Sequence, residues 1–320
     1  MKILLVRMSS MGDLVHTLPA IEDLSKKCPD IELHWLCEAS FDAIARMHPF
    51  VKKVHTLSWR AWRKNIVSRE TWKKIASLKA LLKSENYDAV LDAQGLIKSA
   101  IFAKFANAEV WGFDYSSARE GVASWFYNRK IKISKNQHII PRNRQLFASA
   151  FDYVLSDMPN VSFGNFDEQI ERLDFLPAKY NIALTATSAD SKLWAEENWR
   201  TLFVSTHQKD GLPILLPFGS IREQERANRI ARDLPFVSVC PKLELKEVIN
   251  LLQNSHSVIG VDTGLLHIAN ALNIPTVGIF TTSNPNKTGI QTTQFSENIG
   301  GNGVVPSVDQ VLSIWQKIIS

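Results

Sequence analysis

The sequence is poor in cysteine and has no long hydrophobic run. Its 320 residues include three cysteines, Cys28, Cys37 and Cys240, and no C-x-x-C pair. This usage argues against a disulfide framework and predicts reduced thiols in a cytosolic protein. No apolar run approaches the roughly 18 residues of a membrane span, and the apolar stretch near the N-terminus is too short for a signal peptide. We therefore expect a cytoplasmic protein.

Several motifs that accompany cofactor or metal sites are also missing. No G-x-G-x-x-G follows a strand-like run, and there is no G-x-x-x-x-G-K-[ST] phosphate loop. No D-x-D pair is available for a metal–diphosphate complex, and no H-E-x-x-H or cysteine–histidine cluster suggests zinc. We therefore expect neither a cofactor nor a metal. Any bound phosphate would be neutralised by helix N-termini, hydroxyl groups and lysine.

What the chain does have is an ordinary apolar content and a modest excess of basic residues. It is 45% hydrophobic and 22% charged, with a formal net charge of +5 and a pI of about 9.0. The apolar content is typical of a soluble globular protein. The charge is compatible with a mildly basic protein without an anionic partner. It is equally compatible with binding to nucleic acid, a nucleotide or an anionic membrane surface.

Strand-like and helix-like segments alternate along the chain, which predicts βαβ units and parallel sheets covered on both faces. In the first half we expect strands at 2–7, 32–38, 87–94 and 109–113, and helices at 13–27, about 60–84, 97–107 and 138–152. In the second half we expect strands at 180–186, 212–219, 236–240, 257–262 and 275–280, and helices at 220–234, 243–255, 263–273 and 308–320.

The pattern predicts two doubly wound α/β domains that face each other across a cleft. The segment 152–166 has no clear period and contains Pro159 and Gly164, so we interpret it as the linker. The domains are then 1–158 and 167–305. Ligands in such sheets bind beyond the carboxyl ends of the strands. The residues that follow each strand are therefore the candidate site residues.

Two polar segments follow strands of the second domain. Asp262, Thr263 and Gly264 open a helix whose first amides suit a phosphate, and His267 lies one turn further on. Thr187, Ser188 and Lys192 follow the strand at 180–186, where they could hold a diphosphate. Each residue also has a plain structural interpretation: Asp and Thr commonly cap helices, and Lys192 could be an exposed loop residue. Glu223 follows the strand at 212–219 and could bind a ribose.

The first strand is followed by Asp13 and His16, at the start of the next helix. An acidic residue in the first turn of a helix is stabilised by the helix dipole, so Asp13 could be only a helix-start residue. A carboxylate that faces a bound substrate across a cleft could also be a general base. Spacing alone leaves both interpretations open.

The segments SSMGDLVHTLPA, LDAQGLIKSA, AREGVASWFYNRK, TSADSKLWAEENW and VDTGLLHIANAL together resemble glycosyltransferase family 9, in particular its lipopolysaccharide heptosyltransferase I group. The resemblance covers the chain in order. It implies a GT-B fold of two Rossmann-like domains, with the C-terminal helix at 306–320 crossing back to the first domain. It also implies metal-independent, inverting transfer of L-glycero-D-manno-heptose from ADP-heptose to Kdo of Kdo-lipid A.

The resemblance also implies roles for individual residues. Asp13 matches the catalytic base. The residues that match the ADP-heptose site are Thr187, Ser188, Lys192, Glu223, Leu243, Asp262, Thr263, Gly264, Leu265 and His267. Two positions depart from the usual pattern: Ser188 replaces the second Thr of a Thr-Thr pair, and Leu243 stands where Met is common. Both changes keep the hydroxyl or the apolar volume, so we expect the roles to persist.

The resemblance places the acceptor on the first domain. Its basic segment, 58–74, carries Arg60, Arg63 and Lys64 among tryptophans, and we expect these residues and Arg119 to face the anionic acceptor. Interleaved Trp and Arg also suit a membrane interface, which implies peripheral association with the cytoplasmic face of the inner membrane. Three alternatives remain open from the residues: a sugar-nucleotide epimerase of the same fold, a basic nucleic-acid-binding protein, and a non-catalytic nucleotide sensor. Nothing in the sequence resembles a nucleic-acid module.

Overall fold

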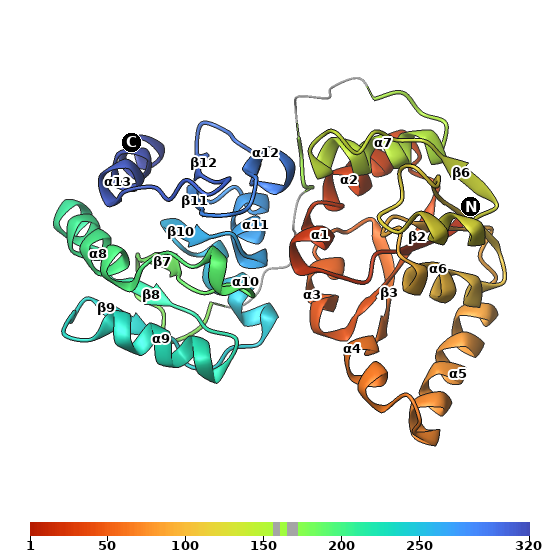
Figure 1. The fold of residues 1–320 in the computed structure, drawn as a ribbon, viewed down its shortest axis with the longest axis horizontal. Helices are drawn as coiled ribbons and strands as arrows, with labels where there is room; N and C mark the ends of the chain where they lie inside the picture. Colours follow the sequence, from red (N-terminus) through yellow and green to blue (C-terminus); the bar gives the residue numbers. More distant parts are fainter. Residues whose placement is uncertain (156–160, 165–171) are drawn as a thin grey trace. The chain divides into compact units, whose positions relative to one another are not determined.

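A computed structural model describes residues 1–155, 161–164 and 172–320 of the chain. The chain divides into two compact units, Met1–Glu168 and Gln169–Ser320 (Figure 1). Each unit has its own sheet and its own core and is described by itself. The predicted linker at 152–166 lies partly outside the described residues.

The first unit is built on six parallel strands in the order β3-β2-β1-β4-β5-β6. The strands are β1 (Lys2–Val6), β2 (Glu32–Glu38), β3 (Val51–Leu57), β4 (Ala89–Asp92), β5 (Glu109–Phe113) and β6 (Arg129–Ile131). The helices are α1 (Met11–Val15), α2 (Leu18–Lys27), α3 (Asp42–Arg46), α4 (Trp59–Trp62), α5 (Arg69–Ser84), α6 (Ile97–Ala103) and α7 (Ile139–Ala150). Short 3₁₀ turns follow several of them.

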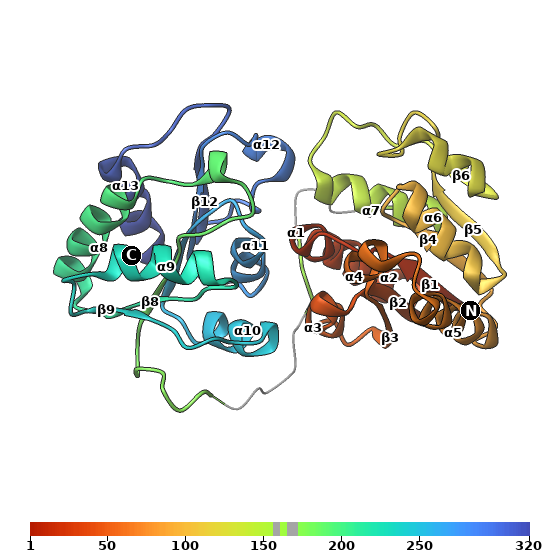
Figure 2. The ribbon, with the colours of Figure 1, turned by 60° about the horizontal axis from the view of Figure 1, so that its bottom comes forward.

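Helices cover both faces of this sheet, as the alternation of apolar strands and helices predicts (Figure 2). Leu4 and Val6 of β1 pack into one core with Leu78 and Leu82 of α5 and Phe102 of α6. On the other side α2 lies against α7. Since the central strands are buried on both faces, their apolar runs are continuous rather than alternating.

The second unit repeats this architecture with strand order β12-β11-β10-β7-β8-β9, all parallel. Its strands are β7 (Asn181–Leu184), β8 (Ile214–Leu216), β9 (Val237–Val239), β10 (Ser257–Val261), β11 (Thr276–Phe280) and β12 (Ser296–Gly300). Its helices are α8 (Glu196–Asp210), α9 (Ile221–Ala231), α10 (Leu245–Gln253), α11 (Gly264–Ala271), α12 (Pro285–Thr288) and α13 (Val308–Ile319). In both sheets the first and fourth strands of the unit are neighbours. This is the switch point at which doubly wound sheets bind ligands.

The expectation that the C-terminal helix crosses back to the first domain is wrong. Helix α13 belongs to the second unit, where Val311, Trp315 and Ile318 are buried in the core with residues of α8 and α9. The indole Nε1 of Trp315 donates a hydrogen bond to Ser257 Oγ at 2.9 Å. An amphipathic helix packs its apolar face wherever a matching core is open, and the sheet of the second unit offers that core.

Two predicted helices are each divided in the structure. The helix expected at 13–27 is α1 and α2, and Pro19 lies in the first turn of α2, a position that proline tolerates because its missing N–H is not needed there. The helix expected at about 60–84 is α4, a 3₁₀ turn at Arg63–Asn65, and α5. Ser68 caps α5 by accepting a hydrogen bond from the Glu70 amide. A serine cap within an apparently continuous pattern marks a new helix start.

Candidate active site

Asp13 lies at the switch point of the first unit, in the first turn of α1 directly beyond β1. Ser10 caps α1, and its backbone amide donates to Asp13 Oδ2 at 3.0 Å while its hydroxyl lies 3.1 Å from the same oxygen. Arg7 NH2 donates to Asp13 Oδ1 at 3.0 Å. The carboxylate is therefore held in one orientation from two sides, with 22% of the side chain exposed.

The environment of Asp13 keeps it ionised. Burial alone would raise the pKa of this carboxyl, but the Arg7 guanidinium, the Ser10 amide and hydroxyl, and Arg119 together hold the pKa below its ordinary value. Arg119 NH1 lies 3.9 Å from Asp13 Oδ2, and its side chain is exposed. Asp13 thus takes part in the helix cap and also lies at the switch point.

Arg7 pairs with Asp13, and Arg142 lies close enough to Arg7 and Arg119 to interact with their charges. Arg7 and Arg142 are buried or half-buried, and both Nε atoms lack a hydrogen-bond partner among the described residues. Burial, together with the like charges of Arg7 and Arg119, lowers the pKa of Arg142. Arg142 reaches this point from α7, about 130 residues beyond Asp13 in sequence. Only folding brings these guanidinium groups together.

Asp92, at the end of β4, supports the turn on the other side of the switch point. It is fully buried and accepts hydrogen bonds from Tyr127 at 2.7 Å and Ser99 at 2.8 Å, and from the amides of Gln94 and Gly95. Burial raises the pKa of Asp92 against the effect of these hydrogen bonds. The segment LDAQGL therefore orders the loop beside Asp13.

In the second unit, the residues expected to bind a diphosphate do come together at the switch point. Lys192 Nζ lies 2.7 Å from Asp262 Oδ2, and Thr187 Oγ1 donates to the carbonyl of Asp262 at 2.7 Å. His267 Nε2 lies 3.9 Å from Asp262 Oδ1. Ser283, which follows β11 and was missed in the sequence, donates to Asp262 Oδ2 at 2.6 Å.

Asp262 is the centre of this group. Burial alone would raise its pKa, but hydrogen bonds from His267, Lys192 and Ser283 and the charge of Lys192 hold the pKa well below the ordinary value. Helix α11 begins directly after it, with Thr263 at the N-cap and Gly264 and Leu265 in the first turn. The N-cap side chain makes no cap hydrogen bond, and Lys192 is only partly buried. The first amides of α11 and the ammonium group are thus available for an anion.

The remaining predicted donor residues lie at the same carboxyl edge of the second sheet, in separate loops. Ser188 is exposed beyond β7, and Leu243 is half-buried between β9 and α10. Glu223 Oε2 accepts a hydrogen bond from the Gly219 amide at 2.6 Å, at the start of α9. In this structure Glu223 therefore acts as part of a helix start, and its expected contact to a ribose stays a prediction.

Segment 58–74 contains exposed basic residues and two packed tryptophans. Arg60, Arg63 and Lys64 are exposed on α4 and the turn after it. The rings of Trp59 and Trp62, in contrast, pack against Phe102, with centroids 5.6 and 6.4 Å away. Two of the tryptophans expected at an interface are thus anchored to the core.

Comparison with known proteins gives the family. The description "Glycosyltransferase family 9 (heptosyltransferase)" matches residues 75–310. The chain is 39% identical over 289 residues to lipopolysaccharide heptosyltransferase 1 of Escherichia coli, covering 89% of each chain. It is 40% identical over 295 residues to the Pseudomonas aeruginosa protein of that name, covering 90% of this chain and 81% of the other. The chain belongs to glycosyltransferase family 9. It is a heptosyltransferase, as the resemblance of its motifs predicts.

Solved structures agree with this assignment and with the GT-B fold. The E. coli heptosyltransferase WaaC with ADP matches with a TM-score of 0.89 at 35% identity, over 99% of this chain and 100% of that one. The same enzyme with ADP-2-deoxy-2-fluoro heptose matches with a TM-score of 0.83 at 33% identity, over 99% of each chain. A UDP-N-acetylglucosamine 2-epimerase from Listeria monocytogenes matches with a TM-score of 0.56 at 13% identity, which is a likeness of fold alone.

None of the described helices combines the length and apolar character needed to span a bilayer.

Proposed function

We propose that this heptosyltransferase moves L-glycero-D-manno-heptose from ADP-heptose to Kdo of Kdo-lipid A, with inversion at the anomeric carbon. The observation that carries the proposal is the placement of Asp13 and of the Lys192–Asp262 group at the two switch points. Its chemical identity rests on the relatives, which are lipopolysaccharide heptosyltransferases, and on the related WaaC structures with ADP and an ADP-heptose analogue.

The donor diphosphate is assigned to the N-terminus of α11. Helix N-termini bind phosphates through unpaired amides and the positive end of the dipole. Lys192 adds a charge, and Thr187 and Ser188 add hydroxyl donors. As the bond from the anomeric carbon to the diphosphate breaks, negative charge grows on the leaving oxygen, and these groups stabilise it.

Asp13 is assigned as the general base. It accepts the proton of a Kdo hydroxyl while that oxygen forms a bond to the anomeric carbon and ADP departs with the electron pair. Arg119, 3.9 Å from Asp13, and Arg142, which interacts with Arg119, are suited to the carboxylate of a sugar acid. Because Asp13 and the assigned donor residues belong to different units, the proposed reaction takes its base from one unit and its donor site from the other.

Metal independence is part of the proposal. At the donor site the carboxylate of Asp262 is engaged by Lys192 and Ser283. The helix N-terminus and Lys192 supply the positive charge that a divalent ion supplies to diphosphates elsewhere.

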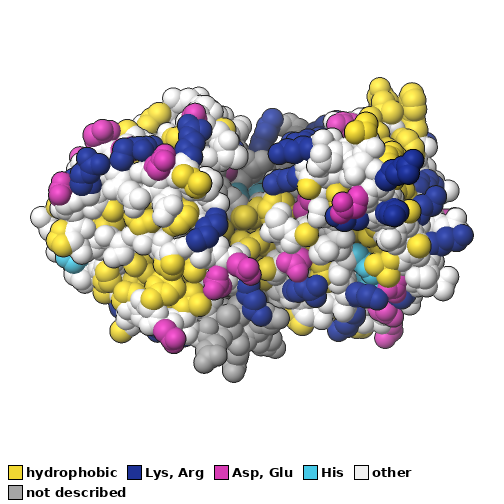
Figure 3. Space-filling model, turned by 90° about the horizontal axis from the view of Figure 1, so that it is seen from below, with side chains coloured by type: hydrophobic (Ala, Val, Ile, Leu, Met, Phe, Trp, Pro, Cys, Tyr) yellow, Lys and Arg dark blue, Asp and Glu magenta, His cyan; other side chains and the backbone are white. Residues whose placement is uncertain are grey.

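Peripheral membrane association is assigned to the turn between α4 and α5. Val67 is 94% exposed and Trp72 is 56% exposed. They lie beside Arg63, Lys64 and Arg69, which are exposed as well. Figure 3 shows this side of the first unit, with dark blue Lys and Arg side chains among yellow hydrophobic ones. Exposed apolar side chains within a basic segment suit an anionic lipid surface.

Vesicle co-sedimentation tests the membrane proposal. Binding should require anionic lipid, and Val67→Ser with Trp72→Ser should reduce it at constant charge. The matched control is Val304→Ser with Val154→Ser, two exposed apolar residues outside this segment, which should leave binding intact. Equal binding by both variants would contradict the assignment.

One assay tests the reaction itself: release of ADP from ADP-heptose with a Kdo-lipid A acceptor, with either one phosphorylated Kdo or two Kdo units, and without any acceptor. We expect acceptor-dependent ADP release and a new heptosyl-Kdo product. Turnover without acceptor would favour an epimerase, and ADP-heptose binding without turnover under any condition would favour a nucleotide sensor. Tight, strongly salt-dependent binding of oligonucleotides would favour the nucleic-acid alternative.

A further inference from the structure

Two buried histidines and a carboxylate meet beside strands β2 and β3 of the first sheet. His34 comes from β2, His55 from β3, and Glu85 from the end of α5. The two imidazoles are 3% and 2% exposed and the carboxylate is 11% exposed. In the part of the chain that the structure describes, this is the one group of three or more His, Cys, Asp or Glu residues placed to share an ion.

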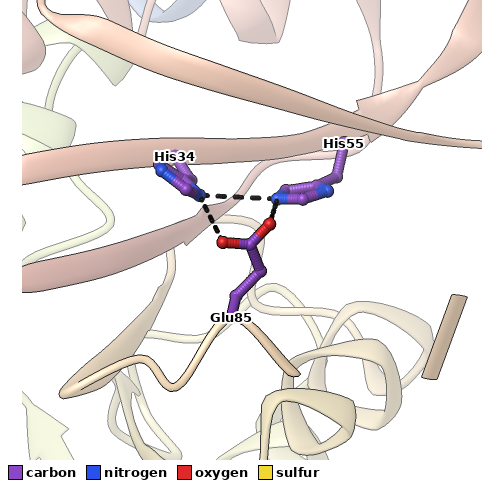
Figure 4. Close-up of side chains that lie close together, drawn as sticks. All are labelled: His34, His55 and Glu85. Atoms are coloured by element: carbon purple, nitrogen blue, oxygen red, sulfur yellow. Dashed lines mark hydrogen bonds and ion pairs between the residues drawn. The ribbon is translucent and has the colours of Figure 1, made fainter. Parts of the chain in front are cut away.

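The ligand atoms converge on one point, as Figure 4 shows. His34 Nδ1 and His55 Nε2 are 3.4 Å apart, and the Glu85 oxygens lie 3.9 and 3.8 Å from them. Two imidazole nitrogens bound to one tetrahedral Zn²⁺ at about 2.0–2.1 Å lie about 3.3 Å from each other. The two nitrogens are therefore already at ligand separation. Each Glu85 oxygen lies nearest a different nitrogen, so the carboxylate must move closer before one oxygen can join both nitrogens on an ion.

The groups around the cluster orient His34 as they do in zinc sites. Its other nitrogen, Nε2, lies 2.9 Å from Glu32 Oε1. Because a carboxylate only accepts, Nε2 carries the proton and Nδ1 keeps its lone pair for an ion. Histidines that bind a metal through one ring nitrogen usually donate a hydrogen bond from the other to a carboxylate in this way. The Tyr87 hydroxyl lies 2.9 Å from both ligand nitrogens.

Two lysines compete with an ion for Glu85. Lys2 Nζ lies 2.6 Å from Glu85 Oε2, and Lys53 pairs with the other oxygen. Lys53 is half exposed, so it can turn away into solvent and open a path to the cluster. The lysines stabilise the carboxylate when no ion is bound and are displaced from it when one is.

We propose that His34, His55 and Glu85 form a binding site for one tetrahedral transition-metal ion of the Zn²⁺ class. The ion ties β2, β3 and the end of α5 together. The fourth position falls to water or to the Tyr87 hydroxyl. The site is structural and does not depend on the proposed transfer reaction, since none of its three residues is assigned to that reaction.

The test measures metal binding directly on the full chain. Co²⁺ added to metal-free protein should bind with one ion per chain and show the intense visible absorption of tetrahedral cobalt, and Zn²⁺ should displace it. His55→Asn and Glu85→Gln should each abolish that absorption, and Glu32→Gln should weaken affinity roughly 10- to 100-fold. The matched control is His48→Asn, which alters another buried histidine paired with a glutamate at 3.1 Å and should leave cobalt binding unchanged.

Lys53→Ala tests the site through its Zn²⁺ affinity and leaves all three ligand residues in place. Removing the competing lysine should raise Zn²⁺ affinity several-fold, whereas histidines that bind metal adventitiously would not respond to it. Zn²⁺ should also raise the thermal unfolding midpoint of the wild type and of Lys53→Ala but not of Glu85→Gln. Octahedral or absent cobalt spectra, unchanged affinity in Glu85→Gln, or weaker binding in Lys53→Ala would each overturn the proposal.

Discussion

Asp13 combines a structural and a proposed chemical role at the scale of one residue. Its carboxylate closes the first turn of α1 through Ser10 and is paired with Arg7 at 3.0 Å. Such contacts stabilise a helix start by about 0.5–2 kcal/mol, so removal of the side chain perturbs both stability and reaction. A substitution that keeps the cap separates the two roles.

Asp13→Asn is that substitution, because the Asn amide oxygen can still accept the Ser10 amide hydrogen bond. We expect kcat to fall by roughly 10²- to 10⁴-fold, the usual contribution of a general base. ADP-heptose affinity should change little, since the proposed donor residues lie in the other unit, and stability should fall less than in Asp13→Ala because the cap hydrogen bond is kept. Steady-state kinetics with calorimetry on the same variant measures both. Activity within a few-fold of the wild type would leave Asp13 as a helix cap alone.

The pH profile provides a second check on Asp13. Its pKa is lowered from 3.8, so the carboxylate stays ionised at every pH above that value, and its contribution to stability is lost only as pH falls through the lowered pKa. We expect Asp13 to impose no acid limb on kcat/KM between about pH 5 and 8. A limb in that range that is missing from the residual activity of Asp13→Asn would contradict the lowered pKa, because Asp13 would then titrate between pH 5 and 8.

Lys192→Ala tests the diphosphate site of the second unit. A charge-assisted contact of this kind is worth about 1.5–3 kcal/mol, so the Kd for ADP-heptose should rise roughly 10- to 150-fold and transfer should slow. Calorimetry with ADP measures the affinity. Lys317→Ala is the matched control, because Lys317 is also a paired lysine of this unit, 2.9 Å from Glu297 on β12. Equal ADP affinity in both variants would return Lys192 to an ordinary loop lysine.

At the scale of elements, the segment from α4 to α5 carries exposed cations on a helix that is packed against the core. Trp59 and Trp62 pack on Phe102, and Arg60 lies over the Phe41 ring at 5.0 Å. The exposed Arg63 and Lys64 follow on the 3₁₀ turn. A rigid helix that holds exposed cations can attract an anionic acceptor through a field that salt screens.

Replacing Arg60, Arg63 and Lys64 together by Ala should raise the acceptor KM at low salt and flatten its dependence on ionic strength. The Debye length is about 8 Å at physiological salt, so the wild-type acceptor KM should rise as salt is added. The donor KM should stay nearly constant. The charge-matched control replaces three exposed cations of the second unit, Lys209, Arg232 and Lys317, and should preserve the acceptor KM. Loss of donor affinity in the first variant would place the substrates on the opposite units.

At the scale of the whole molecule, two units with the same strand order carry different parts of the proposed reaction. The first carries the base and the exposed cations, and the second carries the anion site at α11. Each sheet brings its first and fourth strands side by side, so each unit has one switch point and one cluster of polar residues beyond it.

Chelation tests the metal-free chemistry of the assembled enzyme. Exhaustive treatment with EDTA should leave the transfer rate unchanged, because Lys192 and the α11 N-terminus supply the positive charge for the leaving diphosphate. Stripping an ion from the His34–His55–Glu85 site should lower thermal stability without slowing transfer. Complete loss of activity that Mg²⁺ or Mn²⁺ restores would contradict the metal-free mechanism.

The sequence by itself determined the central strands and the residues that follow them. Strands such as β1 and β10 are buried on both faces, so their apolar runs stand out against the helices around them. The missed strands β3, β6 and β12 are all sheet edges, which are less buried and carry residues such as Lys52 and Lys53. Candidate residues beyond strand ends, such as Thr187 and Asp262, could be read because parallel strands end at a common edge.

Only the tertiary structure decided which distant side chains meet. Arg142 reaches Arg7 from α7, and His34, His55 and Glu85 meet across two strands and a helix end without any motif spacing. The placement of α13 on the second unit likewise depended on which core had room for Trp315. The local pattern of apolar residues indicates which segments are buried and whether they are strands or helices. These contacts depend instead on strand order and helix packing, which no short segment specifies.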